Sequence, residues 1–244
     1  WAHDWSKYLR TRGIEPERIA ILIRDEPTTA AELQLILEVG RAIRSGEPRF
    51  RIWNDIHWGD PGTAPPVLDQ VMREACDIQC FNVQGYLAYP EKNDRWMAKQ
   101  AREGLTWWCY TGGGSHRLTD PYVAFLLRGW FCFDKGLTGT HWWSFGDGNG
   151  GFSWNEYLNA GTTRSPLYLS EDGITTSKSM EAIREGAQDY ELLRMLQEWI
   201  DQAGDSGGPA DTVRAATHLL QKEVPEVLAA FDQQRMAWKE PKDR

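Results

Sequence analysis

The chain has 244 residues, and its 35 acidic residues outnumber its 27 basic ones, which gives a net charge of −8. Because no run of five or six like charges occurs, neither nucleic acid nor an anionic membrane surface is expected as a partner. No apolar stretch approaches the roughly 20 residues that span a bilayer, so membrane insertion is not predicted. The 13 tryptophans are the unusual feature, since Trp rings fill protein cores and also stack on the faces of sugars.

Apolar segments with β character recur along the chain at a spacing of roughly 27 to 33 residues, which is the length of a βα unit. They follow an N-terminal segment, 1–13, that predicts a helix with Trp5, Tyr8 and Leu9 on one face. The expected strands are 18–23, 50–53, 78–81, 105–110 and 137–143.

Helical patterns lie between these strands. Thr29 and Glu32 form a capping box ahead of an amphipathic stripe, and weaker patterns cover 65–75, 91–103 and 122–135. Alternating strands and helices predict an α/β fold with a parallel sheet, either doubly wound or closed as a barrel. We predict the C-terminal portion of a (β/α)₈ barrel, with about five βα units followed by C-terminal helices. About three further units are then expected before Trp1.

A Gly- and Asn-rich segment that begins at residue 144 is predicted to be a long loop. Helices are expected at 176–200 and at 210–238, the second interrupted at Pro225. We predict a partial barrel catalytic domain at 1–203 and a helical extension packed on it at 204–244. The four cysteines match no zinc spacing and no dense disulfide framework, so buried thiols are expected.

The first predicted strand runs directly into two carboxylates, Asp25 and Glu26, and then into Pro27. The C-terminal ends of barrel strands form the catalytic face, so both acids are candidate catalytic residues. Neighbouring residues point in different directions, which suits one for orientation and the other for proton transfer. The alternative is structural: Asp25 caps the next helix and Glu26 complements its dipole.

Two segments resemble glycoside hydrolase family 123 and its uncharacterised relatives. The first is the strand that ends in the triplet Asp-Glu-Pro at 25–27, and the second is a late helix with Arg-Glu-Gly at 184–186 and Asp-Tyr-Glu at 189–191. The resemblance extends from about Arg18 to Leu196. The order and separation of the segments are more specific than the triplet alone.

The resemblance implies a substrate-assisted, retaining hydrolysis of terminal 2-acetamido sugars, particularly N-acetylgalactosaminides. Glu26 would protonate the departing glycosidic oxygen, and Asp25 would hold the acetamido N–H while the carbonyl of the substrate attacks the anomeric carbon. No nucleophile from the enzyme is needed in such a scheme. A general acid also needs a raised pKa, which apolar surroundings rich in Trp can provide.

Further candidates follow the other strands at the same predicted edge, where Asn54 and Asp55 come directly after the second strand. The expected sugar-binding residues are Asn54, Asn82, Trp107, Trp108, Tyr110, Trp142 and Trp143. Because side chains alternate along a strand, one member of each Trp pair should face the sugar and the other should pack in the core. Each Asn has an alternative role as a turn residue.

Asp147 and Glu156 in the long loop are alternative partners for Glu26 in a conventional two-carboxylate mechanism. His57, His116 and His141 form no metal-binding pattern, so neither a metal nor a cofactor is expected. In the late helix, Arg184 and Asp189 are expected to be structural.

The leading function is therefore a glycosidase of the N-acetylhexosaminidase type whose partner is a carbohydrate substrate. A non-catalytic carbohydrate-binding or scaffold protein on a degenerate barrel is a second class that also explains the tryptophans. A doubly wound nucleotide-binding enzyme is disfavoured, because no glycine-rich phosphate motif follows a strand. The oligomeric state and the compartment are left open, although a secreted or periplasmic location is compatible with the sequence.

Overall fold

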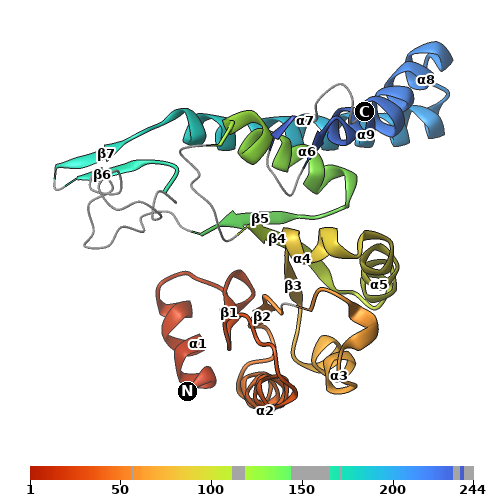
Figure 1. Cartoon of the computed structure of the whole chain (residues 1–244). Helices are drawn as coiled ribbons and strands as arrows, with labels where there is room; N and C mark the ends of the chain where they lie inside the picture. The colour runs from red at the N-terminus through yellow and green to blue at the C-terminus, as the bar shows by residue number, and fades with distance from the viewer. Residues whose placement is uncertain (57, 112–118, 144–164, 171, 233–236, 239–244) are drawn as a thin grey trace. The chain divides into compact units, whose positions relative to one another are not determined.

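The computed structural model describes residues 1–56, 58–111, 119–143, 165–170, 172–232 and 237–238 (Figure 1). The chain divides into two compact units, Trp1–Tyr110 and Thr111–Arg244. The two units are described in turn.

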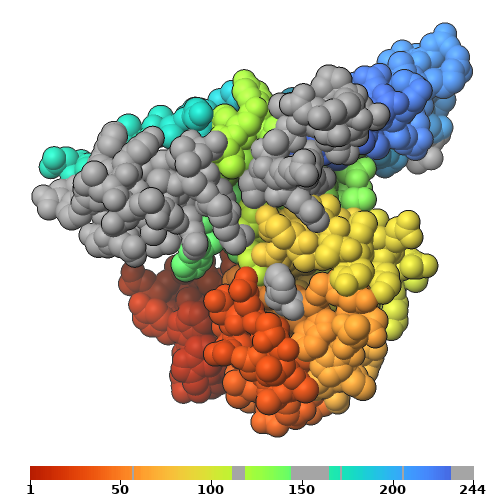
Figure 2. Space-filling view, in the orientation of Figure 1, coloured from red at the N-terminus to blue at the C-terminus, as the bar shows by residue number. Residues whose placement is uncertain are grey.

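The first unit alternates strands with helices. Its strands are β1 (Ala20–Leu22), β2 (Arg51–Asn54), β3 (Ile78–Asn82) and β4 (Thr106–Thr111), the last of which runs to the boundary of the unit. Its helices are α1 (Ala2–Thr11), α2 (Ala30–Gly46), α3 (Val67–Glu74), α4 (Val83–Ala88) and α5 (Pro90–Arg102), with 3₁₀ turns η1 (Pro16–Arg18) and η2 (Pro61–Thr63). In the space-filling view this unit, coloured red to yellow, is closely packed (Figure 2).

All neighbouring strands of this unit are parallel, in the order β1-β2-β3-β4. The register pairs Trp53 with Ile78, Cys80 with Trp108, and Asn82 with Tyr110. Paired residues point to the same side of a parallel sheet, and neighbours along a strand point to opposite sides. The register therefore separates one face with Trp53, Trp108 and Tyr110 from a second face with Ile52, Phe81 and Trp107. We call these the tyrosine face and the helix face.

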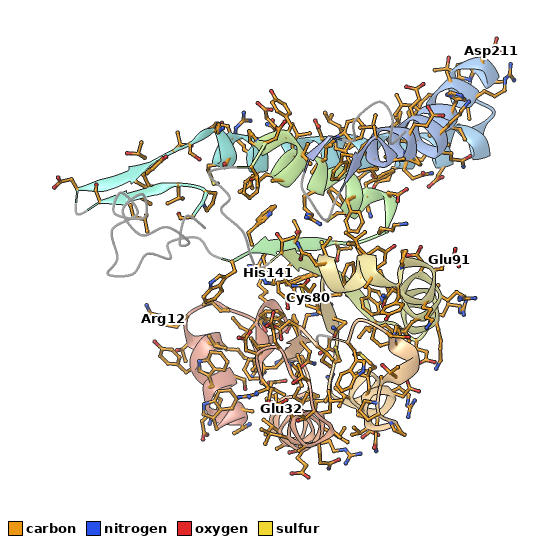
Figure 3. The ribbon with its side chains drawn as sticks, viewed as in Figure 1. Arg12, Glu32, Cys80, Glu91, His141 and Asp211 are labelled. Atoms are coloured by element: carbon orange, nitrogen blue, oxygen red, sulfur yellow. The ribbon has the colours of Figure 1, made fainter. Side chains whose placement is uncertain are left out.

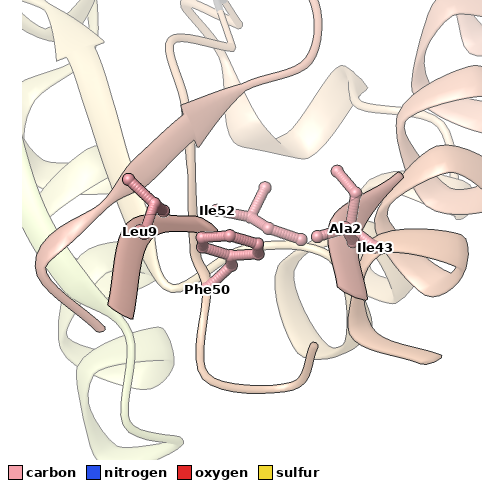
Figure 4. Packing of buried hydrophobic residues seen from close by; sticks show 5 residues of the cluster. All are labelled: Ala2, Leu9, Ile43, Phe50 and Ile52. Atoms are coloured by element: carbon pink, nitrogen blue, oxygen red, sulfur yellow. The ribbon is translucent and has the colours of Figure 1, made fainter. Parts of the chain in front are cut away.

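The helix face is covered by helices whose apolar stripes meet the strands. Ala2, Leu9, Ile43, Phe50 and Ile52 form one buried cluster, which joins α1 and α2 to β2 (Figure 4). At the start of α2, the Thr29 side chain accepts the Glu32 N–H at 3.2 Å, and Glu32, labelled in Figure 3, accepts the Thr29 N–H at 3.1 Å. The predicted capping box is confirmed.

The second unit is mainly helical. Its helices are the π-helix η3 (Tyr122–Leu126), α6 (Leu127–Asp134), α7 (Lys178–Ser206), α8 (Ala210–His218), the π-helix η5 (Leu219–Glu223) and α9 (Val224–Ala229). Its strands are β5 (Gly139–Trp142), β6 (Tyr168–Ser170), β7 (Gly173–Thr175), β8 (Phe231–Asp232) and β9 (Ala237–Trp238). Within this unit, the Trp143 N–H donates to the carbonyl of Thr111 at 3.1 Å.

Close packing joins α6 to α7 in this unit. A Cβ on Gly186 would lie 2.6 Å from the carbonyl oxygen of Leu126, and a Cβ on Gly129 would overlap the carbonyl of Gly186. The glycines therefore permit a backbone approach that no other residue would allow. Two side chains of α7 reinforce the contact: Asp189 accepts the Trp130 indole N–H at 2.8 Å, and the Tyr190 hydroxyl donates to the Leu137 carbonyl at 2.9 Å.

Two expectations for the C-terminal part are wrong. The predicted helix 210–238 ends at Ala229, and β8 and β9 pair antiparallel beyond it. Pro225 is tolerated because it lies in the first turn of α9, directly after the widened turn η5, where its missing N–H and its ring cost little. The segment before α7, which the sequence analysis includes in the long loop, forms the antiparallel pair of β6 and β7.

The α/β class and the parallel order of the strands are confirmed, and the arrangement is compatible with part of a barrel. All four cysteines are described, and they are buried thiols as predicted. Within the described residues, no helix is both long and apolar enough to cross a membrane. The domain boundary at residue 203 stays a prediction; α7 itself continues to Ser206.

Candidate active site

Polar side chains converge at the C-terminal ends of the strands in the first unit. Asp25 and Glu26 follow β1, Asp55 follows β2 directly, Asn82 ends β3, and Tyr110 is the last residue but one of β4. Parallel strands place these ends at one edge of the sheet, which is where active sites of α/β folds are built. The helix α2 is capped by Thr29, so Asp25 does not serve as its cap.

Glu26 is held at two points. Its carboxylate oxygen Oε1 accepts a short hydrogen bond from the Tyr110 hydroxyl, and its backbone N–H donates to Asp55 Oδ1 at 3.0 Å. The Glu26 backbone has a φ of +41°, which is the left-handed region that residues with a Cβ rarely adopt. Such backbone strain is retained where surrounding contacts fix it, and it is found disproportionately at active sites.

Asp55 is the buried acid of the group, with only 3% of its surface exposed, whereas Asp25 and Glu26 are exposed. Burial, together with a side-chain hydrogen bond to Asp25 and the negative charge of Asp25, raises the pKa of Asp55 to about 7. The Glu26 N–H bond acts in the opposite direction but is outweighed. Asp25 and Asp55 therefore form a carboxyl pair that favours the retention of one proton.

Tyr110 is 4% exposed and holds its proton firmly. Burial raises its pKa far above the ordinary value, and the hydrogen bond to Glu26 raises it further, while a bond with the Asn82 side chain opposes the shift. Asn82 also caps α4, since its Oδ1 accepts the N–H groups of Gln84 at 3.0 Å and Gly85 at 3.3 Å. Asn82 is therefore a turn residue, as one alternative predicted, and it also lies beside Tyr110, which binds Glu26.

The structure separates the two neighbouring tryptophans of β4. Trp108 lies on the tyrosine face, where its ring centroid is 6.5 Å from that of Trp53. Trp107 lies on the helix face, is 5% exposed, and packs edge-on against Trp96 at 5.2 Å. Asn54 is fully buried and also lies on the helix face, where its side-chain amide donates to the Ala75 carbonyl at 3.0 Å.

The tryptophans of β5 belong to the second unit. Trp142 is half-buried and packs against Phe125 at a centroid distance of 5.6 Å, beside Ala182 of α7. Trp143 follows the strand and is 55% exposed. That one of the two faces the sugar stays a prediction.

Trp53 is a site residue that the sequence analysis did not select, and Asp55 was named there only as a strand-end candidate without a role. The signal was present: Asp55 follows a strand at the same edge as Glu26, and Trp53 lies two residues before it on the same face. Asp147, Glu156, His57 and His116 lie outside the described residues. Within the described part, no group of three or more His, Cys, Asp or Glu side chains is arranged to hold a metal ion.

No protein-family model matches the chain, and no curated protein matches it. A similar solved structure is that of a family 123 glycoside hydrolase from Clostridium perfringens, described in connection with glycolipid glycan hydrolysis, with a TM-score of 0.58 and 17% sequence identity. The match covers 84% of this chain and 36% of that enzyme, so this chain spans little more than a third of it. At this identity the likeness concerns the fold.

Proposed function

We propose that this chain carries the acid/base centre of a glycosidase that removes a terminal 2-acetamido sugar, with retention of anomeric configuration. The observation that carries the proposal is the placement of Glu26, whose carboxylate is held by Tyr110 and whose backbone is held by Asp55 at the C-terminal edge of parallel strands. The fold similarity to a glycoside hydrolase supports the same reaction class.

In this proposal Glu26 is the general acid and base. With Oε1 engaged by Tyr110, the second oxygen transfers the proton to the glycosidic oxygen as its bond to the anomeric carbon breaks. The acetamido carbonyl oxygen of the substrate forms the new bond to that carbon. Glu26 then takes a proton from a water molecule, whose oxygen bonds to the anomeric carbon as the bond between that carbon and the acetamido oxygen breaks. This opens the cyclic intermediate, and Glu26 is again the protonated acid.

Asp25 accepts the acetamido N–H and so directs the carbonyl toward the anomeric carbon. Its neighbour Asp55 is buried, which leaves the exposed Asp25 to face the substrate. On the same face, the half-buried Trp53 and Trp108 lie two residues before Asp55 and Tyr110, and in this proposal they stack on the apolar face of the sugar ring. Within this class, the proposed substrate is a β-N-acetylgalactosaminide, as the family resemblance implies.

The test uses purified protein and a panel of nitrophenyl glycosides, with an Asp25→Asn/Glu26→Gln double variant as the blank for contaminating hydrolases. Nitrophenol release from the N-acetylgalactosaminide or N-acetylglucosaminide, and not from sugars with a 2-hydroxyl group, is the expected result. Silence across the panel, together with measurable sugar binding, would favour a carbohydrate-binding protein instead. Equal cleavage of sugars without the acetamido group would contradict substrate assistance.

A further inference from the structure

Asp55 occupies a position that links both exposed acids. One carboxyl oxygen, Oδ1, accepts the Glu26 backbone N–H at 3.0 Å, and the carboxyl group is also hydrogen-bonded to the side chain of Asp25. Two carboxylates repel one another unless a proton lies between them. A neutral carboxylic acid has one acceptor oxygen and one O–H donor, which matches these two contacts.

We propose that Asp55 is a positioning residue of this site, which donates its carboxyl proton to Asp25 and accepts the Glu26 N–H, and so fixes the geometry of both acids at once. This inference rests on the proposed function for its catalytic consequence. The proton that orients Asp25 and the bond that fixes the left-handed Glu26 backbone both depend on a single buried side chain.

The surroundings of Asp55 favour the neutral form. The titratable groups that face it are Asp25 and Glu26 after β1, Cys80 on β3 and Tyr110 on β4, and each of them is neutral or negative. Arg24, which directly precedes Asp25 in the chain, forms an ion pair with Glu32 at 2.6 Å. Removing the proton would therefore place an uncompensated charge in a buried position, in agreement with the pKa of about 7.

The proton makes site geometry and protein stability depend on pH in a defined direction. In the unfolded chain the carboxyl group has its ordinary pKa of 3.8, and in the folded protein its pKa is about 7. Between these values the folded state binds more protons than the unfolded state, so stability falls as pH rises from about 4 to about 7 and is then unaffected by this group. The site should lose its Asp25 orientation over the upper part of that range.

Asp55→Asn separates the hydrogen bonds from the titration. Its amide oxygen can still accept the Glu26 N–H and its NH₂ group can still donate to Asp25, but it carries no proton that is lost near pH 7. Asp55→Ala removes both bonds. The two variants therefore form a matched pair in which only Asn conserves the contacts.

The first measurement is the melting temperature of the wild type and of Asp55→Asn between pH 4 and pH 8, which requires no enzymatic activity. We expect the wild-type melting temperature to fall relative to that of Asp55→Asn as pH rises to about 7. Parallel curves for the two proteins would overturn the proposal, because Asp55 would then hold no proton with a raised pKa.

The second measurement is the pH profile of kcat and KM on a nitrophenyl 2-acetamido glycoside. Asp55→Ala should lower kcat more than it changes KM. Asp55→Asn should be at least about tenfold more active than Asp55→Ala near pH 5.5. The fall in kcat that the wild type shows near pH 7 should occur at a different pH in Asp55→Asn. Equal impairment of the two folded variants would overturn the positioning role. A wild type inactive on every sugar would contradict the proposed function alone, and the melting curves would still decide whether Asp55 holds the proton.

Discussion

The acid cluster of the first unit and the α6–α7 contact of the second unit use polar side chains in opposite ways. In the acid cluster, Asp25, Glu26 and Asp55 are hydrogen-bonded to one another or to Tyr110, and two of the acids remain exposed. In the α6–α7 contact, two polar side chains of α7 bond to groups outside their own helix: Asp189 bonds to the Trp130 indole, and Tyr190 bonds to the Leu137 carbonyl. Both regions carry residues on which the family resemblance depends.

The comparison shows that polar side chains in one chain can serve either proton transfer or helix packing. The partners of the side chains distinguish the two cases: titratable groups that face one another suit proton transfer, and groups bonded to an indole or a carbonyl suit packing. Arg184 fits neither case, since it is exposed and pairs with Glu181 and Glu185 of its own helix and bonds to Gln188.

The largest expected effect is that of Glu26→Gln, which tests whether the acid cluster of the first unit transfers protons. Gln cannot protonate a leaving group, so hydrolysis of natural 2-acetamido glycosides should fall by about 10²- to 10⁴-fold. Nitrophenyl substrates, whose leaving group departs with little help, should lose much less. Steady-state rates on both substrate types decide this.

Asp25→Asn is the matched control for Glu26→Gln. It should impair both substrate types, because the attack of the acetamido carbonyl is then the compromised step. If Glu26→Gln lowered both rates equally, Glu26 would not be the acid. Covalent trapping of Asp147 or Glu156 by a fluorosugar would show that a conventional carboxylate nucleophile operates instead.

The second prediction contrasts the neighbouring tryptophans of β4. Trp107→Ala should lower the free energy of unfolding by about 3–5 kcal/mol, because a buried ring packed against Trp96 is lost. Trp108→Ala should cost less stability and should weaken substrate binding more. Denaturant unfolding and KM measurements on both variants test this, and the reverse order of effects would reassign the two faces of β4.

The fold could be predicted to a large extent because its signals are local. Three features follow from periodicity and connection length, which can be read in the sequence: the spacing of the strands, the Thr29 cap and the parallel order. The pair of β6 and β7 was missed although an Asp-Gly step at 172–173 lies at its turn, since the pattern was assigned to the preceding loop. Pro225 indicated a disturbance of the helix but not its form, because a widened turn accommodates it.

The site could be predicted only in part. The strand-end rule led to Asp25, Glu26, Asn82 and Tyr110, but strand alternation leaves an ambiguity between neighbours until the register is known. The register places Trp108 with Tyr110 and places Trp107 and Asn54 on the other face. The bond between Asp55 and Asp25 joins residues 30 positions apart in the chain, and no pattern in the sequence states such a contact.

A third prediction tests the close packing of α7 in the second unit. Gly186→Ala should lower the free energy of unfolding by about 1–3 kcal/mol, since its Cβ would lie 2.6 Å from the carbonyl oxygen of Leu126 at the end of η3 and force η3 and α7 apart. Gly204→Ala is the matched control on the same helix: nothing lies within 4 Å of its Cβ, so it should be neutral or stabilise the protein by up to about 1 kcal/mol. Equal losses in the two variants would show that close approach at Gly186 is unimportant.

The smallest expected effect belongs to the hydrogen bond between Trp130 and Asp189, and a double-mutant cycle isolates it. Trp130→Phe removes the indole N–H, Asp189→Ala removes the acceptor, and changes in helix propensity or ring size cancel in the cycle. We expect a coupling energy of about 1 kcal/mol from denaturant unfolding, because the bond is partly exposed to water. Activity per folded molecule should be unchanged in both single variants if Asp189 serves only the packing of α7. A loss of kcat without loss of stability would instead connect Asp189 to the chemistry and remove the distinction between the two regions.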